Sequence, residues 1–121
     1  MKHETTSRPA SLFIGRWQPF HEGHKKLIET VLEKGSPVLI AIRDTLISDK
    51  NPHTVEERRR MIESALAEYG KLVNIIAIPD IVEVCYGRDV GYGIREINLD
   101  SETESISGTK IRAARVAVNN V

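Results

Sequence analysis

The segment SLFIGRWQPFHEGHKKLIETVLEKG, residues 11–35, decides the fold. It opens with SLFIG, an uninterrupted apolar run closed by glycine, which is typical of a parallel strand covered on both faces. Residues 22–34 place apolar side chains on one helical face, and Gly35 is positioned to end that helix. The apolar positions of this face are Leu27, Ile28, Val31 and Leu32. The segment therefore predicts one strand followed by one helix.

The same alternation continues along the chain. Residues 37–42 (PVLIAI) and 72–78 (LVNIIAI) are two further apolar runs that predict strands. Between them, residues 54–69 predict a helix that begins with a capping-box pattern, Thr54 followed by Glu57. The order strand, helix, strand, helix, strand favours right-handed crossovers. We therefore predict the α/β class, with a Rossmann-like open parallel sheet flanked by helices on both faces.

Beyond residue 79 the pattern is less regular. Residues 81–86 and 94–99 predict short strands, with a glycine-rich loop between them. Apolar residues at helical spacing predict a C-terminal helix that starts near Ser107. We expect residues 1–10 to form a flexible lead-in and residues 11–121 to form a single domain.

Length and composition narrow the function classes. A chain of 121 residues fits one domain, and its 17 Lys+Arg balance 17 Asp+Glu, so we expect no nucleic-acid partner. The apolar runs are too short to span a bilayer and residues 1–9 lack a signal-like stretch, so we expect no membrane partner and a cytoplasmic location. A single cysteine, Cys85, argues against a disulfide framework or a Cys-rich zinc site, and no metal-ligating set is predicted.

Histidines, arginines and other polar residues gather where the predicted strands end, which is where open α/β sheets bind ligands. In GRWQPFHEGH, residues 15–24, His21 and His24 stand three apart at a helix start, so both imidazoles can face one object. An anion suits that position because the N-terminal amides and the helix dipole favour negative charge. The alternative is a chance pair, or a histidine that caps its own helix.

A second cluster is ISGTKIR, residues 106–112. Ser107 and Thr109 are N-cap residue types, and Gly108 permits close backbone approach. Such a pattern alone is usually only a helix cap. Two anion-suited helix starts in one small sheet favour a ligand with several phosphates, and a nucleoside triphosphate fits that requirement.

The two clusters resemble the signatures of a known superfamily. Residues 15–24 are similar to the HxGH signature of the nucleotidylyltransferases, and residues 106–112 are similar to their ISSTxIR signature. The details GRxQPFHxGH, NPHTVEER (residues 51–58) and IPDI (residues 78–81) resemble archaeal-type nicotinamide-nucleotide adenylyltransferases.

The resemblance implies a reaction and a set of binding residues. Family members bind ATP or CTP, usually with Mg2+, and an acceptor phosphate attacks the α-phosphorus and releases pyrophosphate. By this resemblance His21 and His24 are catalytic and contact the phosphates. The implied nucleotide-binding residues are Gly15, Arg16, Trp17, Phe20, Gly23, Lys50, Ile106, Ser107, Gly108, Thr109 and Arg112. Among them, Ser107, Thr109 and Arg112 hold the β- and γ-phosphates and the leaving pyrophosphate.

The acceptor side departs from the resemblance. Archaeal-type relatives carry more sequence between the IPDI-like and ISGT-like runs, and the tryptophan expected after IPDI is absent here. The candidate acceptor-binding residues are Arg43, Asp80, Tyr86, Arg88 and Tyr92. In length the chain is nearer to glycerol-3-phosphate cytidylyltransferases, but its first motif lacks their F-D-x-x-H form.

Three hypotheses follow. We prefer an adenylyltransferase that acts on a small phosphorylated acceptor. The others are a cytidylyltransferase for a glycerol- or alditol-phosphate and a non-catalytic nucleotide-binding module. Relatives are commonly dimers or larger, so a homo-oligomer is expected.

Two charged groups have alternative interpretations. The run of arginines at residues 58–60 is typical of a solvated helix face, with Arg58 the one expected to turn inward or to contact nucleotide. Arg43 and Asp44 follow a strand, so they either meet a ligand or form a structural ion pair.

Overall fold

The computed structural model describes residues 8–97 and contains a three-stranded parallel sheet with two helices. The strands are β1 (Ser11–Gly15), β2 (Val38–Asp44) and β3 (Val73–Pro79). Helix α1 (Glu22–Leu32) joins β1 to β2; α2 (Val55–Ala65) and a 3-10 segment, η1 (Ala67–Leu72), join β2 to β3. The strand order is β1-β2-β3, and Gly15 pairs with Ile42 while Asp44 pairs with Pro79. The predicted open parallel α/β sheet is confirmed.

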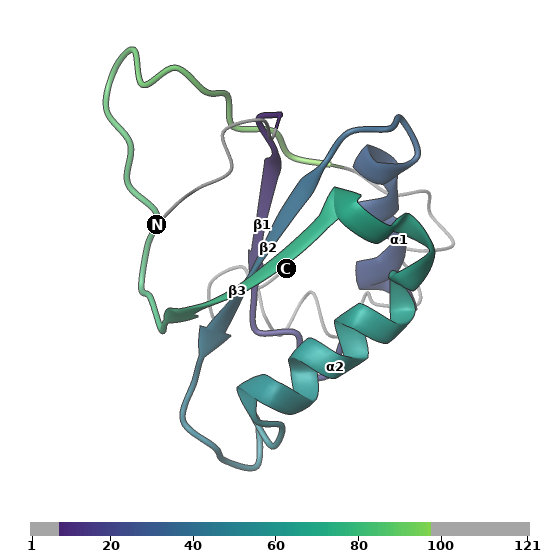
Figure 1. Ribbon diagram of the computed structural model, residues 1–121. Helices are drawn as coiled ribbons and strands as arrows, with labels where there is room; N and C mark the ends of the chain where they lie inside the picture. The colour runs from purple at the N-terminus through teal and green to yellow at the C-terminus, as the bar shows by residue number, and fades with distance from the viewer. Residues whose placement is uncertain (1–7, 98–121) are drawn as a thin grey trace, which may run out of the picture.

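Both helices pack on the same face of the sheet (Figure 1). This follows from two right-handed crossovers that move in the same direction across three sequential strands. The core lies between the sheet and the helices, where Ile28, Ile40 and Ile62 are wholly buried. Burying an isoleucine side chain contributes about 1.5–3 kcal/mol, so these residues hold the layers together.

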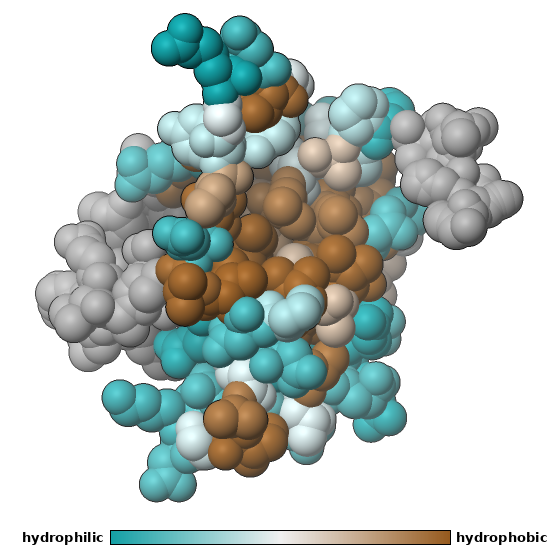
Figure 2. Space-filling view, turned by 90° about the vertical axis from the view of Figure 1, so that its left-hand side faces the viewer, coloured by the Kyte–Doolittle hydropathy of each residue, from teal (hydrophilic) through white to brown (hydrophobic). Residues whose placement is uncertain are grey.

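The opposite face of the sheet is apolar and, within residues 8–97, carries no helix. Figure 2 shows this face as a brown area crossing the middle of the molecule. The register places Leu12, Leu39, Ile14 and Ile76 on it, and Leu12 is 55% and Ile76 40% exposed. The C-terminal helix predicted to start near Ser107 lies outside the described residues.

Glycines end the helical segments where the sequence predicts. Gly35 follows α1 with φ 79°, and Gly70 interrupts η1 with φ 54°, a left-handed region that glycine enters without steric cost. The predicted helix over residues 54–69 is shorter than expected, because α2 ends at Ala65 and the 3-10 segment takes over.

The strands predicted after β3 are wrong for the residues that the structure describes. Residues 81–97 form no strand and run as an exposed loop with a turn near Asp89 (Figure 1). Val82 and Val84 are exposed instead of packed, and no neighbouring strand pairs with this stretch within the described residues. None of the helices within residues 8–97 is long and apolar enough to span a bilayer.

Candidate active site at the carboxyl ends of the strands

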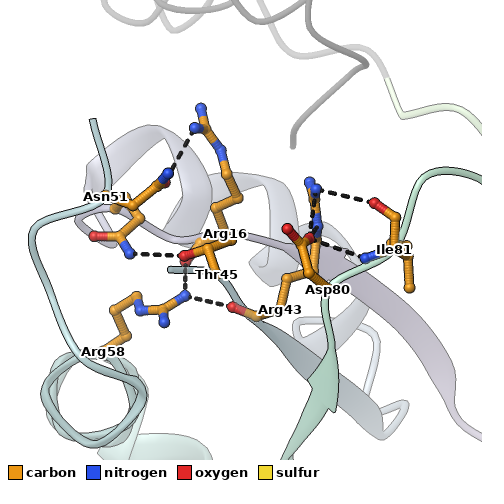
Figure 3. Close-up of polar contacts among 8 residues, drawn as sticks. Arg16, Arg43, Thr45, Asn51, Arg58, Asp80 and Ile81 are labelled. Carbon is orange, nitrogen blue, oxygen red and sulfur yellow. Dashed lines mark hydrogen bonds and ion pairs between the residues drawn. The ribbon is translucent and has the colours of Figure 1, made fainter. Parts of the chain in front are cut away.

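The predicted site residues meet at one edge of the sheet because all three strands run parallel. Arg16 directly follows β1, Arg43 lies in the last pairs of β2, and Asp80 directly follows β3. Arg43 pairs in register with Ile78, which brings the ends of β2 and β3 together. Figure 3 shows Arg16, Arg43 and Asp80 gathered at this edge.

The N-terminus of α1 presents the two histidines of the first motif in a reciprocal cap. His21 is the N-cap residue, and its Nδ1 accepts from the Gly23 amide at 3.0 Å. His24 Nδ1 accepts from the His21 amide at 3.2 Å, which closes a capping box with imidazoles in place of the usual Ser/Thr and Glu. The rings stack with centroids 3.7 Å apart.

The cap sets the hydrogen-bonding role of one nitrogen in each ring. In both His21 and His24, Nδ1 accepts a backbone N–H. Nε2 is therefore the ring nitrogen through which each histidine can donate to a ligand. The capping interpretation and the anion-binding interpretation are compatible, because they use different nitrogens of the same ring.

Two aromatic side chains, Trp17 and Phe20, pack against His24. Trp17 is 1% exposed and donates its indole N–H to the Ala41 carbonyl at 3.1 Å. Its ring meets His24 edge-on at 4.9 Å, and Phe20 lies 5.6 Å from His24. Trp17 has φ 53°, a strained value that the turn after β1 imposes. The structure thus buries Trp17 between His24 and β2, with almost no surface exposed.

Arg16 is the first cation of the site, and an amide holds it. Its Nη1 donates to Asn51 Oδ1 at 3.1 Å, while its Nε is buried with no hydrogen-bond partner within residues 8–97. Burial lowers the pKa of Arg16, and the charge of Arg43 lowers it further, whereas Asp80 acts in the opposite direction. The two arginines are thus close enough to repel, and an anion between them would relieve that repulsion.

Arg43 forms the structural ion pair, although with a partner other than its neighbour Asp44. Its Nε donates to Asp80 Oδ1 at 2.9 Å, and its Nη2 lies 2.8 Å from the same oxygen. Nη2 also donates to the Ile81 carbonyl at 3.2 Å. This clamp joins the ends of β2 and β3 and fixes the start of the loop that follows.

Arg58 turns inward, as expected from the sequence for this one residue of the run of arginines. It is 0% exposed, and its Nη1 donates to the carbonyls of Arg16 at 2.7 Å and Arg43 at 2.8 Å. Its Nε donates to the Thr54 carbonyl at 3.1 Å. Burial lowers the pKa of Arg58, and the charge of Asp44 opposes that shift.

Gln18, to which the sequence analysis assigns no role, bonds the backbone of the loop after β2. Its amide donates to the His53 carbonyl at 3.0 Å and accepts from the His53 amide at 2.9 Å. A second bond, at 3.5 Å, reaches Thr45 Oγ1. The only sequence signal was the place of this glutamine inside the first motif, residues 15–24. Such a residue cannot be assigned without knowing which backbone lies opposite.

The remaining predicted residues fall into three groups. Gly15 and Gly23 are buried at the end of β1 and the start of α1, and Lys50 is exposed on the loop that holds Asn51. Tyr86, Arg88 and Tyr92 lie on the exposed loop, and no hydrogen bond within residues 8–97 joins them to the strand ends. The residues Ile106, Ser107, Gly108, Thr109 and Arg112 lie outside the described part of the chain.

No group of three or more His, Cys, Asp or Glu residues that could hold a metal ion occurs within residues 8–97. Mg2+ commonly binds through one or two carboxylates together with substrate phosphates, without a dedicated protein cage. The donor set here, two arginines and two imidazole N–H groups, suits the phosphates and not the metal. A Mg2+ ion that arrives on a triphosphate is compatible with it.

Comparison with known proteins finds similarity in the part of the chain that contains β1 to β3. The family described as "Cytidylyltransferase-like" matches residues 12–83, which run from β1 to just past β3. The nicotinamide-nucleotide adenylyltransferase of Thermococcus sibiricus is 43% identical over 75 residues, covering 58% of this chain and 40% of that protein. The protein of the same name from Methanococcus aeolicus is 31% identical over 129 residues, covering 84% of this chain and 74% of its own. The chain thus spans about two fifths of the Thermococcus relative's length.

Proposed function

The chain belongs to the cytidylyltransferase-like family, within the nucleotidylyltransferase superfamily, and on that premise we propose that it transfers AMP from ATP to a small phosphorylated acceptor. Pyrophosphate is the second product. The observation that carries the proposal is the reciprocal histidine cap at the start of α1, beside Arg16. It supplies two fixed donors at a helix N-terminus, an arrangement suited to a polyphosphate.

The reaction needs no protein nucleophile. An oxygen of the acceptor phosphate forms a bond to the α-phosphorus of ATP, and the bond from that phosphorus to the bridging β-oxygen breaks. Negative charge grows on the oxygens of the five-coordinate phosphorus, and donors fixed in advance stabilise it without reorganising. We assign that stabilisation to the Nε2–H groups of His21 and His24, with Arg16 facing the phosphates.

Charge repulsion is the other barrier that the site lowers. A phosphorylated acceptor and a triphosphate repel each other, so they react only when cations hold them together in line. Arg16 and Arg43 are close enough to interact electrostatically and lie on two adjacent strand ends. We assign Arg16 to the nucleotide and the Arg43–Asp80 clamp to the acceptor side. Mg2+, carried on the triphosphate, would neutralise further charge.

The identity of the nucleotide and the acceptor follows the relatives. Because these relatives are named nicotinamide-nucleotide adenylyltransferases, ATP is the preferred nucleotide and nicotinamide mononucleotide the first acceptor to test. CTP with glycerol-3-phosphate is the alternative pair. A nucleotide that binds only the folded chain raises its melting temperature, so ATP should stabilise the protein more than CTP. The reverse order would favour the cytidylyltransferase.

The test of the mechanism is the His24→Ala variant in a pyrophosphate-release assay with ATP, Mg2+ and a set of phosphorylated acceptors. Loss of one transition-state donor lowers kcat by about 100-fold or more. Lys26→Ala, on the exposed side of α1, is the matched control and should keep wild-type turnover. Because the variant also removes half of the cap, both proteins are assayed well below their melting transitions. Unchanged turnover in His24→Ala would refute the mechanism, and nucleotide binding with no turnover in any pairing would favour the non-catalytic module.

A further inference from the structure

We propose that Arg58 is a positioning residue that sets the spacing between the Arg16 and Arg43 backbones and thereby aligns the two halves of the site. The catalytic consequence rests on the proposed function. The structural consequence, a fixed pair of cations for a polyphosphate, does not. Arg58 itself is buried, and its hydrogen bonds go to backbone carbonyls.

The first argument is the geometry of its hydrogen bonds. One nitrogen, Nη1, donates to both the Arg16 carbonyl at 2.7 Å and the Arg43 carbonyl at 2.8 Å, as Figure 3 shows. These carbonyls belong to residues 27 positions apart, on different strand ends. A single atom bonded to both fixes their separation within the reach of two short hydrogen bonds. Nε ties the same side chain to the Thr54 carbonyl, at the start of α2.

The second argument is the charge of the residues that Arg58 holds. Burial lowers the pKa of Arg16, and repulsion from the positive charge of Arg43 lowers it further. The two like charges therefore favour a wider separation of the turns that carry them. Arg58 opposes that separation through the two backbone carbonyls, while the side chain of Arg16 contacts Asn51 and that of Arg43 contacts Asp80.

The third argument is that only a guanidinium satisfies this arrangement. Its planar fork carries five N–H donors, so it reaches three backbone carbonyls at once, whereas a lysine ammonium is a compact point charge on a flexible stem. Complete burial of a cation is costly unless hydrogen bonds compensate it. The residue is 0% exposed, and the bonds from Nε and Nη1 to the three carbonyls compensate part of this cost, while Nη2 is buried with no hydrogen-bond partner within residues 8–97.

Other contacts hold the fold independently of Arg58, which makes the proposal testable. Gln18 bonds both backbone groups of His53, and Arg16 bonds Asn51, so the loop after β2 stays attached to the turn after β1. Removing Arg58 should therefore loosen the distance between the two cations more than it disrupts the sheet.

The experiment compares Arg58→Gln and Arg58→Lys with Arg60→Gln, a matched control on the exposed side of α2 whose side chain pairs with Glu56. The first readout is binding of inorganic tripolyphosphate by calorimetry, which requires no turnover. Loss of one well-placed charged hydrogen bond should weaken binding about 10-fold in Arg58→Gln. Arg58→Lys should recover part of this loss, and Arg60→Gln should bind as the wild type does.

The second readout is the split between kcat and KM for ATP. Misplacement of reacting groups by about 1 Å costs about 100-fold in rate, so kcat should fall far more than KM rises. A merely structural role would lower the melting temperature and leave kcat and tripolyphosphate binding of the folded variants equal to those of Arg60→Gln. That result overturns the proposal. If Arg58→Gln does not fold, Arg58→Lys decides by the same readouts, and failure of both to fold also overturns it in favour of a purely structural tie.

The two proposals fail separately. If the wild type binds tripolyphosphate more tightly than Arg58→Gln but releases no pyrophosphate with any acceptor, the proposed function fails and the positioning role stands. If the wild type turns over and the Arg58 variants match Arg60→Gln, the positioning role fails alone.

Discussion

Replacing His21 by serine and by alanine separates the two roles that the structure gives to this histidine. Its Nδ1 caps α1 by accepting from the Gly23 amide, and its Nε2–H is assigned to the phosphates. Serine keeps the cap, because its hydroxyl is a strong N-cap acceptor, but it cannot reach the phosphates. Alanine loses both functions. Each variant loses the ring stacked 3.7 Å from His24, so that loss cancels when the two are compared.

The expected magnitudes follow from the cap and the donor. Alanine in place of a good N-cap costs about 0.5–2 kcal/mol, typically about 1. In domains of 60–100 residues, 1 kcal/mol shifts the melting temperature by about 4–8 °C. His21→Ala should therefore melt several degrees below His21→Ser. Turnover should behave differently, because both variants lack the Nε2 donor and should lose a similar factor of about 100 or more.

The assays are thermal unfolding followed by circular dichroism and pyrophosphate release at a temperature where both variants are folded. Thr54→Ser and Thr54→Ala provide the control, since Thr54 caps α2 through a capping box with Glu57. That second pair should reproduce the difference in stability without a common loss of turnover. Wild-type turnover in His21→Ser would refute the role of the ring as a donor. Equal melting temperatures for the two His21 variants would refute the cap.

Three further results are expected. The hydroxyl of Tyr69 donates to Glu29 at 2.7 Å, which raises the pKa of Tyr69 to about 12. Wild-type stability should therefore exceed that of Tyr69→Phe below pH 10, and the difference should vanish as the pH rises through 12. Denaturant unfolding measured across that pH range checks it. Trp17→Phe removes the indole donor and leaves its acceptor on β2 buried, so urea unfolding should show a loss of about 1–3 kcal/mol. Asn51→Asp would neutralise Arg16, so tripolyphosphate binding measured by calorimetry should weaken while the melting temperature does not fall.

The elements up to residue 79 could be predicted because their signals are local. Apolar runs identify β1, β2 and β3, the pattern of Thr54 and Glu57 marks the start of α2, and Gly35 marks the end of α1. Each signal depends on residues within one turn or one strand. The strands predicted after residue 80 rest on apolar content alone. A strand also requires a neighbour to pair with, and none is present there within the described residues.

The candidate site was predictable only in part, for a related reason. His21, His24 and Arg16 belong to a contiguous motif at a strand end, so their place is readable from the sequence. Gln18 and Arg58 act on backbone atoms of residues 35 and 42 positions away, respectively. A sequence shows side-chain types but not which carbonyl faces them across the fold. The partner of Arg43 escaped prediction in the same way, since Asp80 lies 37 positions along the chain.

The net charge of zero therefore says little about this edge of the sheet, because its cations are held mainly by uncharged groups. An amide oxygen holds Arg16, and three backbone carbonyls hold Arg58. Within residues 8–97, Arg43 is the one of these three arginines with a carboxylate in direct contact, from Asp80. Dipoles of amides and carbonyls satisfy hydrogen bonds without cancelling charge, so the three arginines keep a net positive charge at the strand ends beside Asp44 and Asp80. This arrangement favours the proposed transfer of AMP, since within residues 8–97 Arg16 is bonded to an amide and not to a carboxylate that would compete with the incoming anion.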